Sequence, residues 1–394
     1  MRIGRTVIAL GVVSLLNDAA SEMILPLLPA FLVALPGGGA AILGLMEGIA
    51  ESVSAVLKLG SGWASDRSGS RRPWLILGYG IAVVARPLMG LAGSAWHVVG
   101  LRFADRVGKG VRTAPRDAML ASSADERSRG LVFGFHRAMD HAGAVVGPGL
   151  ALLAMGVLGM QVRTVFLMAA IPGALVLVSL VVALAGTGKV AAAPAAGRPS
   201  LRGLGRPMHV YLVAVLLFAL GNSSDAFLLL RAADMGVALG QLPVLWIVLH
   251  LSKIALSVVA GAVSDRVGRK AVIVSGWIVY AAVYVLFGLA LSPLHIWILF
   301  VVYGFYYGLT EGAERALVAD LVPAQARGTA FGTFHFTVAV GALPSSLAMG
   351  ALYQWAGPLP AFATGAVLAA AAAIVLLALP VTRSGDSPAR PQGQ

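Results

Sequence analysis

Cysteine is absent from the sequence, and charged residues are scarce. Without cysteine, disulfides, thiolate metal sites and cysteine nucleophiles are all excluded. Charged side chains make up 12% of the 394 residues, about half the ~25% of an ordinary soluble domain. No H-E-x-x-H motif or comparable metal-binding spacing occurs either, so the sequence predicts no bound metal and no cofactor. The composition is that of a membrane protein.

Long apolar segments follow one another along almost the whole chain. Hydrophobic residues account for 58% of it, and about 20 apolar residues in a helix cross a hydrocarbon core about 30 Å thick. We count twelve such segments, at residues 6–35, 39–63, 73–93, 95–123, 128–158, 161–186, 207–235, 238–263, 270–291, 293–322, 326–355 and 358–382. The first continues through Asn17, Asp18 and Glu22 without a small-residue cleavage site, so we expect it to remain as a helix and not to be removed as a signal peptide.

The formal net charge of +12 would suit a nucleic-acid partner, but the positions of the basic residues indicate a lipid bilayer instead. They gather in alternate loops, at Arg2 and Arg5, at Arg67, Arg71 and Arg72, at Arg127 and Arg129, at Lys189, Arg198, Arg202 and Arg206, at Arg266, Arg269 and Lys270, and at Arg327. The other loops hold almost none, Arg163 being the main exception. Cytoplasmic loops carry such an excess of Lys and Arg, so we expect both termini in the cytoplasm and no bound nucleic acid.

The chain divides into two similar halves. A polar stretch rich in Ala, Gly and Pro predicts a flexible linker, which gives a six-helix bundle at 1–186, a cytoplasmic linker at 187–206, a second six-helix bundle at 207–383 and a cytoplasmic tail at 384–394. GWASDRSGSRRP after the second segment matches GAVSDRVGRKA after the eighth, and the first and seventh segments share polar interruptions, LLNDAASE and LGNSSDAF. Duplicated halves with polar breaks in mid-membrane are typical of secondary transporters, whose binding site lies between the repeats.

The repeated loop carries a resemblance to a known family. The pattern G-x-x-x-D-R-x-G-R-K is complete from Gly261 to Lys270 and nearly complete from Gly62, with Ser70 in place of a basic residue. With these motifs at matching places, the chain resembles the major facilitator superfamily over essentially its whole length. The resemblance implies an all-α membrane fold of twelve helices in two pseudo-symmetric bundles. It also implies a latch between the bundles on the cytoplasmic side, with Asp66, Arg67, Arg71, Asp265, Arg266 and Arg269 as its residues.

Two further matches to the family are partial. Gly143, Gly147 and Pro148 resemble the G-x-x-x-G-P motif of antiporters in the superfamily, which implies export, although close helix packing through small residues also explains them. Arg106 matches an R-x-x-x-G pattern whose arginine is associated with proton coupling in the family. Arg112 stands where that pattern has a small residue, which makes this helix unusually basic.

The segment LRFADRVGKGVRTAPRDAML, residues 101–120, places five cations and two anions among apolar neighbours. At about 100° per residue, all seven lie within an arc of about 140° on one helix. One unneutralised charge at the bilayer centre costs at least ~2.5 kcal/mol, so this face requires ion pairs with neighbouring helices, water or a ligand. The excess of positive charge favours an anionic ligand held by arginine. The predicted substrate-binding residues are Arg102, Arg106, Lys109, Arg112 and Arg116, with Asn17, Asn222 and Tyr307.

Carboxylates and imidazoles inside a membrane are costly unless they are used, so those of this chain are candidates for carrying protons. Asp18 and Glu22 share one face of the first helix and are expected either to pair with the basic helix or to titrate. The other candidates are Asp105, Asp140, His136, Glu311 and Glu314.

Together these features predict a monomeric, proton-coupled secondary transporter of the bacterial inner membrane that works by rocking of two halves. We favour export, by antiport, of a small organic molecule with anionic character, such as a drug, a metabolite or a metal chelate. Proton symport that imports an anionic metabolite is the alternative. A membrane-embedded enzyme and a receptor that does not transport are remoter alternatives, because the sequence shows neither a nucleophile motif nor a long output domain.

Overall fold

The computed structural model describes residues 3–38, 40–185, 201–238 and 241–378, and all regular elements among these residues are helices. The predicted tail at 384–394 and most of the predicted linker at 187–206 lie outside the described residues. Eight helices within the described ranges are long and apolar enough to cross a membrane.

The helices before residue 186 form a first group and those after residue 200 a second group. The first group consists of α1 (Arg5–Glu22), α2 (Leu28–Ala34), α3 (Ala40–Ser68), α4 (Arg72–Leu88), η1 (Met89–Leu91), α5 (Ala95–Ser122), η2 (Glu126–Ser128), α6 (Arg129–Gly156), α7 (Val162–Met168) and α8 (Ala170–Ala185). The second group consists of η3 (Leu201–Leu204), α9 (Arg206–Gly221), α10 (Ala226–Asp234), α11 (Leu242–Val267), α12 (Arg269–Leu289), α13 (Pro293–Asp320), η5 (Ala324–Ala326), α14 (Arg327–Ala356) and α15 (Pro358–Leu377).

Three of the predicted segments are each built from two helices. Segment 6–35 consists of α1 and α2, and the turns between them contain Pro26, which has no backbone N–H to donate. Segment 161–186 consists of α7 and α8, with Pro172 in the first turn of α8, where a missing N–H costs little. Segment 207–235 consists of α9 and α10, separated by the polar residues 222–225, whose side chains compete for backbone hydrogen bonds.

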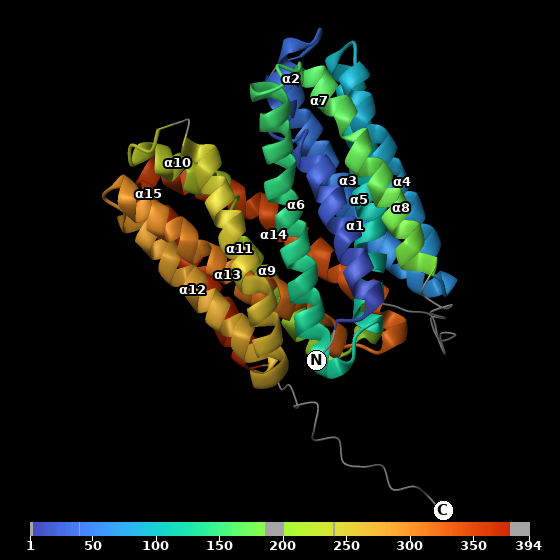
Figure 1. The fold of residues 1–394 in the computed structure, drawn as a ribbon. Helices are drawn as coiled ribbons and strands as arrows, with labels where there is room; N and C mark the ends of the chain where they lie inside the picture. The colour runs from blue at the N-terminus through green and yellow to red at the C-terminus, as the bar shows by residue number, and fades with distance from the viewer. Residues whose placement is uncertain (1–2, 39, 186–200, 239–240, 379–394) are drawn as a thin grey trace, which may run out of the picture.

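The two groups converge at one end of the molecule and splay apart at the other (Figure 1). The N-terminus lies at the converging end, whereas α2, α7 and α10 lie at the splayed end. The sequence predicts that the end bearing the loops rich in Arg and Lys faces the cytoplasm, and this orientation stays a prediction. Hydrogen bonds between described residues of the two groups all involve the segments 66–71, 117–141, 250–269 and 311–335.

The interiors of the two groups differ in chemistry. Buried aromatic rings fill the second group, among them Trp277, Tyr280, Tyr284, Tyr303 and Phe287. The first group also has an apolar core, but it buries many ionisable side chains, most of them from α4, α5 and α6. A buried charge requires a partner or a function, so the charged side chains of the first group define the candidate site.

Candidate functional site

The basic segment forms the middle of α5. Ser94 caps α5 and Ser292 caps α13, and each side chain accepts a hydrogen bond from the backbone N–H three residues later. The matching caps place the two helices in register as repeats of each other. In this register Lys109 of α5 corresponds to Tyr307 of α13, so one repeat is basic where the other is aromatic.

Three arginines surround the carboxylate of Asp105, which is 2% exposed. Arg86 donates from Nε at 2.9 Å, Arg102 donates from Nη1 at 3.5 Å, and Nε of Arg106 lies 4.0 Å away. Arg86 also donates to the backbone oxygen and to Oδ1 of Asn17, at 2.8 and 3.0 Å. These contacts join Asp105 and Asn17 in one ion-pair cluster that ties α1, α4 and α5 together. The roles predicted for Asp105 in proton coupling and for Asn17 in substrate binding stay predictions.

Two other predicted substrate cations have protein partners. Nη1 of Arg112 donates to the backbone oxygen of Gly78 at 3.2 Å, and its guanidinium lies 4.6 Å from the ring centroid of Tyr79. Gly78 provides the room, because a Cβ there would lie 2.6 Å from Cβ of Arg112. Arg116 donates from Nε and Nη2 to Oδ1 of Asp117, at 3.0 and 2.9 Å. A backbone oxygen and an aromatic ring of α4 therefore accommodate the charge of Arg112, and a carboxylate of α5 itself accommodates that of Arg116.

Five ionisable side chains of the first group form what we term the open charge cluster: Asp18, Glu22, Glu51, Lys58 and Lys109. Within the described ranges none of the five has an ion-pair partner within 4.0 Å. They are nevertheless neighbours, since Lys109 interacts electrostatically with all three carboxylates. None of the five is fully buried. The three carboxylates also offset the excess of positive charge on α5.

The predicted proton sites His136 and Asp140 lie on α6. Nε2 of His136 is 2.9 Å from Oγ of Ser14, and Nδ1 is 3.6 Å from Oδ2 of Asp140, which also pairs with Arg137. A hydroxyl, an imidazole and a carboxylate thus lie next to one another in space, in the order found in the catalytic triad of a serine hydrolase. Ser14 is only 1% exposed and His136 is completely buried, so this series cannot meet a substrate in this conformation.

Two imidazole–carboxylate contacts join the helix groups. Nε2 of His141 lies 2.9 Å from Oε2 of Glu311, and its Nδ1 lies 3.3 Å from Nδ1 of His250. Nε2 of His335 lies 2.8 Å from Oδ2 of Asp117. His250 could not be selected from the sequence, because a single histidine in an apolar segment belongs to no motif.

In the second group, a carboxylate and a lysine lie on either side of a tyrosine. Oδ1 of Asp225 accepts a hydrogen bond from the hydroxyl of Tyr303 at 2.7 Å, and Oδ2 accepts one from Tyr307 at 3.1 Å. Nζ of Lys253 lies 3.5 Å from the ring centroid of Tyr307, which is a cation–π contact. The predicted substrate residue Tyr307 is therefore held in place from two sides.

The remaining predicted residues of the second group are Asn222 and Glu314. Nδ2 of Asn222 donates to the hydroxyl of Tyr306 at 3.4 Å, while its buried Oδ1 has no hydrogen-bond partner within the described structure. Oε1 of Glu314 accepts a hydrogen bond from Nε1 of Trp277 at 3.0 Å. This bond directs Glu314 toward α12, within the second group.

The two aspartates of the repeated loop each cap a helix of the opposite group. Asp66 accepts hydrogen bonds from the N–H groups of Gly328 and Thr329 at the start of α14, at 3.0 and 2.7 Å. Asp265 accepts hydrogen bonds from the N–H groups of residues 130 and 131 at the start of α6, at 2.9 and 2.8 Å. A helix N-terminus favours a carboxylate, so both caps stabilise the converging end.

The arginines of this loop differ in position. Arg269 pairs with Asp265, and Nη2 of Arg71 lies 3.8 Å from Oδ1 of Asp66. Arg71 also donates to the backbone oxygen of residue 324 in the opposite group, at 3.3 Å. Arg71 therefore provides the basic side chain that the loop lacks at Ser70. Burial lowers the pKa of Arg71 from its usual range, and the charge of Asp66 opposes this shift. Arg67 and Arg266 are exposed.

Glycines bring helices into backbone contact at three places. A Cβ on Gly62 would lie 2.1 Å from the backbone oxygen of Gly328, and a Cβ on Gly261 would lie 2.2 Å from that of residue 130, so both glycines allow the helix groups to meet. Within the first group, a Cβ on Gly143 or Gly147 would lie 2.4 or 2.5 Å from a backbone oxygen of α1. Pro148 follows inside α6. The antiporter-like motif therefore packs against the turn of α1 that carries Asp18 and Glu22.

Substitution of Gly62 by alanine is expected to open the converging end. The added Cβ cannot fit against Gly328, and overpacking of this kind costs about 1–3 kcal/mol. Gly60→Ala is the matched control on the same helix, since a Cβ there meets nothing within 4 Å. Alkylation of a cysteine introduced at the converging end should become faster in Gly62→Ala but not in Gly60→Ala. Equal rates would contradict the assignment of this contact as a seal.

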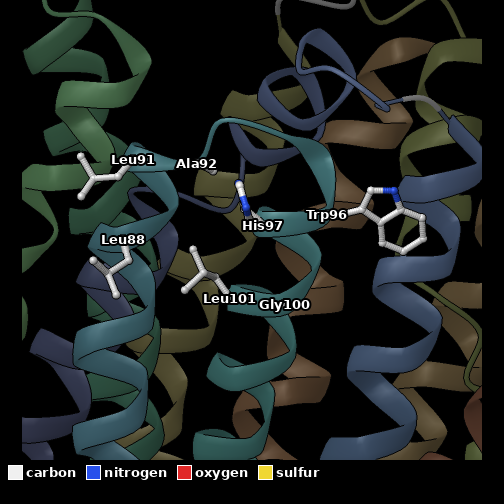
Figure 2. A pocket seen from close by; sticks show the side chains of 7 residues that line it. All are labelled: Leu88, Leu91, Ala92, Trp96, His97, Gly100 and Leu101. Carbon is white, nitrogen blue, oxygen red and sulfur yellow. The ribbon is translucent and has the colours of Figure 1, made fainter.

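One groove is lined by none of the predicted site residues. It has a volume of about 450 Å³ and is lined by Leu88, Leu91, Ala92, Trp96, His97, Gly100 and Leu101. Figure 2 shows it between the end of α4 and the first turns of α5. The lining is almost entirely apolar, so the groove offers no counterion to an anionic substrate.

Comparisons with known proteins agree with this architecture. The chain matches the model of the Major Facilitator Superfamily over residues 10–184 and 226–394. It is similar to an uncharacterized MFS-type transporter of Methanocaldococcus jannaschii, with 34% identity over 385 residues that cover 95% of each chain. It is also similar to the multidrug resistance protein MdtH of Shigella boydii, with 34% identity over 113 residues, 29% of this chain and 28% of that protein.

Solved structures show the same fold. The human organic anion transporter MFSD10 (TETRAN) superposes with a TM-score of 0.79 and 18% sequence identity, over 94% of this chain and 99% of that one. At this identity the likeness concerns the fold alone. The predicted fold class, an all-α membrane protein of the major facilitator type, is confirmed.

Proposed function

The chain belongs to the major facilitator superfamily, and we propose that it is a proton-coupled secondary transporter for a small organic molecule with anionic character. Transport proceeds by alternating access, in which the two helix groups rock about a site between them. The favoured direction is export by proton antiport, across the inner membrane of a bacterium. The protein acts as a monomer with both termini in the cytoplasm.

The open charge cluster is the observation that carries this proposal. Unpaired charges inside a membrane are expensive, and structural charges are usually paired. Among the described residues, Asp18, Glu22, Glu51, Lys58 and Lys109 have no ion-pair partner within 4.0 Å, although Asp18 accepts a hydrogen bond from Asn17 at 2.8 Å. Asp105 and Arg116 nearby form ion pairs, and Arg112 donates to a backbone oxygen. Two lysines can hold an anionic group of a substrate, and the carboxylates can bind protons.

The charge of the substrate decides between antiport and symport. Binding of a proton and of a substrate affect each other reciprocally. A substrate that also carries a cationic group competes with protons for Asp18 and Glu22, which suits antiport. A purely anionic substrate favours bound protons instead, which suits symport. Export is supported by the similarity to a multidrug resistance protein over 113 residues and by the motif at Gly143, Gly147 and Pro148.

Symport remains the second candidate because of one electrostatic interaction. Lys109 interacts electrostatically with Asp18 and Glu22, so neutralising these carboxylates with protons would free Lys109 for an anion. Binding of the proton and binding of the anion would then assist each other.

Reconstitution in liposomes with an internal pH dye tests the proposal. With no imposed gradient, pools of organic anions and of zwitterions are added outside vesicles of known protein orientation. We expect one pool to change the internal pH, and the sign of the change to distinguish antiport from symport. Empty liposomes control for passive leak. Silence with every pool, from protein that elutes as a single folded species, would contradict proton coupling for these substrate classes.

A further inference from the structure

We propose that His141, His250 and Glu311 form a proton-sensitive lock between the two helix groups, and that charging both imidazoles opens it. The inference rests on the proposed function insofar as it names a place where a coupling proton acts. As a statement about conformation, it can be tested without a substrate. His250 was not among the predicted proton sites.

The lock joins three helices of both groups. His141 comes from α6 of the first group, whereas His250 and Glu311 come from α11 and α13 of the second. His141 is the bridge, with Nε2 at 2.9 Å from Oε2 of Glu311 and Nδ1 at 3.3 Å from Nδ1 of His250. Both imidazoles are at least nine-tenths buried, but 19% of the Glu311 side chain is exposed. Protons can therefore enter by way of Glu311.

The contact between the two Nδ1 atoms limits the number of protons that the lock can hold. At 3.3 Å one nitrogen must donate and the other must accept, so a single hydrogen lies between them. If both imidazoles were charged, both Nδ1 atoms would carry a hydrogen, and two like charges would face each other. The conformation described here therefore allows at most one imidazolium in this pair.

The surroundings offer no partner for a second imidazolium. The charged and titratable groups around the lock are Arg137 and Asp140 on α6, Lys253 on α11, and Tyr306, Tyr307, Glu314 and Arg315 on α13. Asp140 is itself paired with Arg137. Among the described residues, Glu311 alone forms an ion pair with either imidazole of the lock. Lys253, a cation on the same helix as His250, adds to the repulsion. Release of the α6–α11 contact is the remaining way to accommodate the charge.

The second imidazole–carboxylate contact provides a matched control. His335 and Asp117 also join the two groups, from α14 and α5. Asp117 accepts hydrogen bonds from Arg116 as well, and Nε of Arg315 lies 3.9 Å from it. No second imidazole faces His335 among the hydrogen bonds of the described residues. A proton on His335 would strengthen its contact with the carboxylate, so this pair should not open when the pH falls.

The absence of cysteine makes a distance measurement straightforward. Leu158 and Leu291 are 58% and 85% exposed and lie at the ends of α6 and α12 remote from the converging end. Spin labels on Leu158→Cys and Leu291→Cys report the separation of the two groups at the splayed end. Pulsed electron paramagnetic resonance in lipid nanodiscs between pH 8 and pH 5 then measures the populations in which the splayed end is separated or closed.

When the lock is closed, the two groups are separated at the splayed end, and when it opens, alternating access brings them together there. We therefore expect the separated form to dominate at pH 8 and to decline as the pH falls. For one linked proton, the population ratio changes up to about tenfold per pH unit near the transition. His250→Gln keeps a hydrogen-bonding side chain but cannot become charged, so it should hold the separated form at pH 5. His335→Gln should respond like the parent protein. If His250→Gln does not fold, His250→Asn provides the same test.

Two results would overturn the lock. One is a pH response in the His250 variants equal to that of the parent, and the other is no pH response in the parent. A pH response that depends on His250, together with silence in the liposome screen, would support the lock and count against the proposed transport. Proton-coupled transport that is unchanged in the His250 variants would count against the lock alone.

Discussion

Replacement of Asp105 by asparagine is expected to prevent stable folding. Asp105 is the common partner of Arg86 and Arg102, and Arg106 lies nearby at 4.0 Å. Asparagine would remove the carboxylate that pairs with Arg86, and loss of one partner of a buried ion pair costs about 3–5 kcal/mol. This is a large fraction of the stability of a typical protein. The yield of monodisperse protein in detergent and its thermal unfolding midpoint measure the effect.

Glu51→Gln is the matched control for this change. It removes the same charge from the same helix group, but Glu51 is exposed and has no ion-pair partner within 4.0 Å among described residues. Its effect on stability should stay within about 0.5 kcal/mol. Adding Arg86→Gln to Asp105→Asn restores part of the charge balance and should recover part of the yield. If Asp105→Asn were as stable as Glu51→Gln, the cluster around Asp105 would not be structural.

Combined replacement of Asp18 by asparagine and Glu22 by glutamine is expected to abolish gradient-driven transport while exchange persists. The two carboxylates carry the coupling protons in this account, and coupling free energies in proteins typically correspond to about 5–150-fold. We therefore expect flux driven by a pH gradient to fall by up to about 100-fold. Substrate counterflow needs no proton, and at saturating substrate it should remain within about threefold of the parent protein even if the affinity for substrate falls.

The control for this pair is Glu126→Gln. The Glu126 side chain is 67% exposed at the converging end, remote from the open charge cluster, and its loss should change neither flux nor counterflow. Equal loss of gradient-driven flux and counterflow in Asp18→Asn/Glu22→Gln would mean that these carboxylates serve folding or substrate binding and not proton coupling.

The architecture was predictable because its signals are local. Apolar segments follow from composition, and the caps formed by Asp66 and Asp265 follow from a repeated loop whose two copies lie at matching places. The breaks in three of the segments were less predictable. A polar stretch such as residues 222–225 can interrupt a helix or lie within one, and packing of the neighbouring helices decides which occurs.

The site was harder to predict, because pairing depends on side chains from other helices. The spacing along α5 placed all seven charges on one arc, yet it could not show that Arg112 turns to Tyr79 of α4 or that Arg86 reaches Asp105. The charge count on α5 alone also overstated the positive excess, since Asp18, Glu22 and Glu51 lie on α1 and α3. The role of His250 depends on its contact with the other helix group, which the sequence of a single segment does not reveal.

The most direct test of the account is the number of protons exchanged when substrate binds. Titration calorimetry of the purified protein, in buffers with different ionisation enthalpies and with the compound that is active in liposomes, gives this number. Because protons and substrate share the open charge cluster, we predict net proton release for antiport or uptake for symport, and loss of either in Asp18→Asn/Glu22→Gln. Binding without any proton exchange by the parent protein would contradict the account.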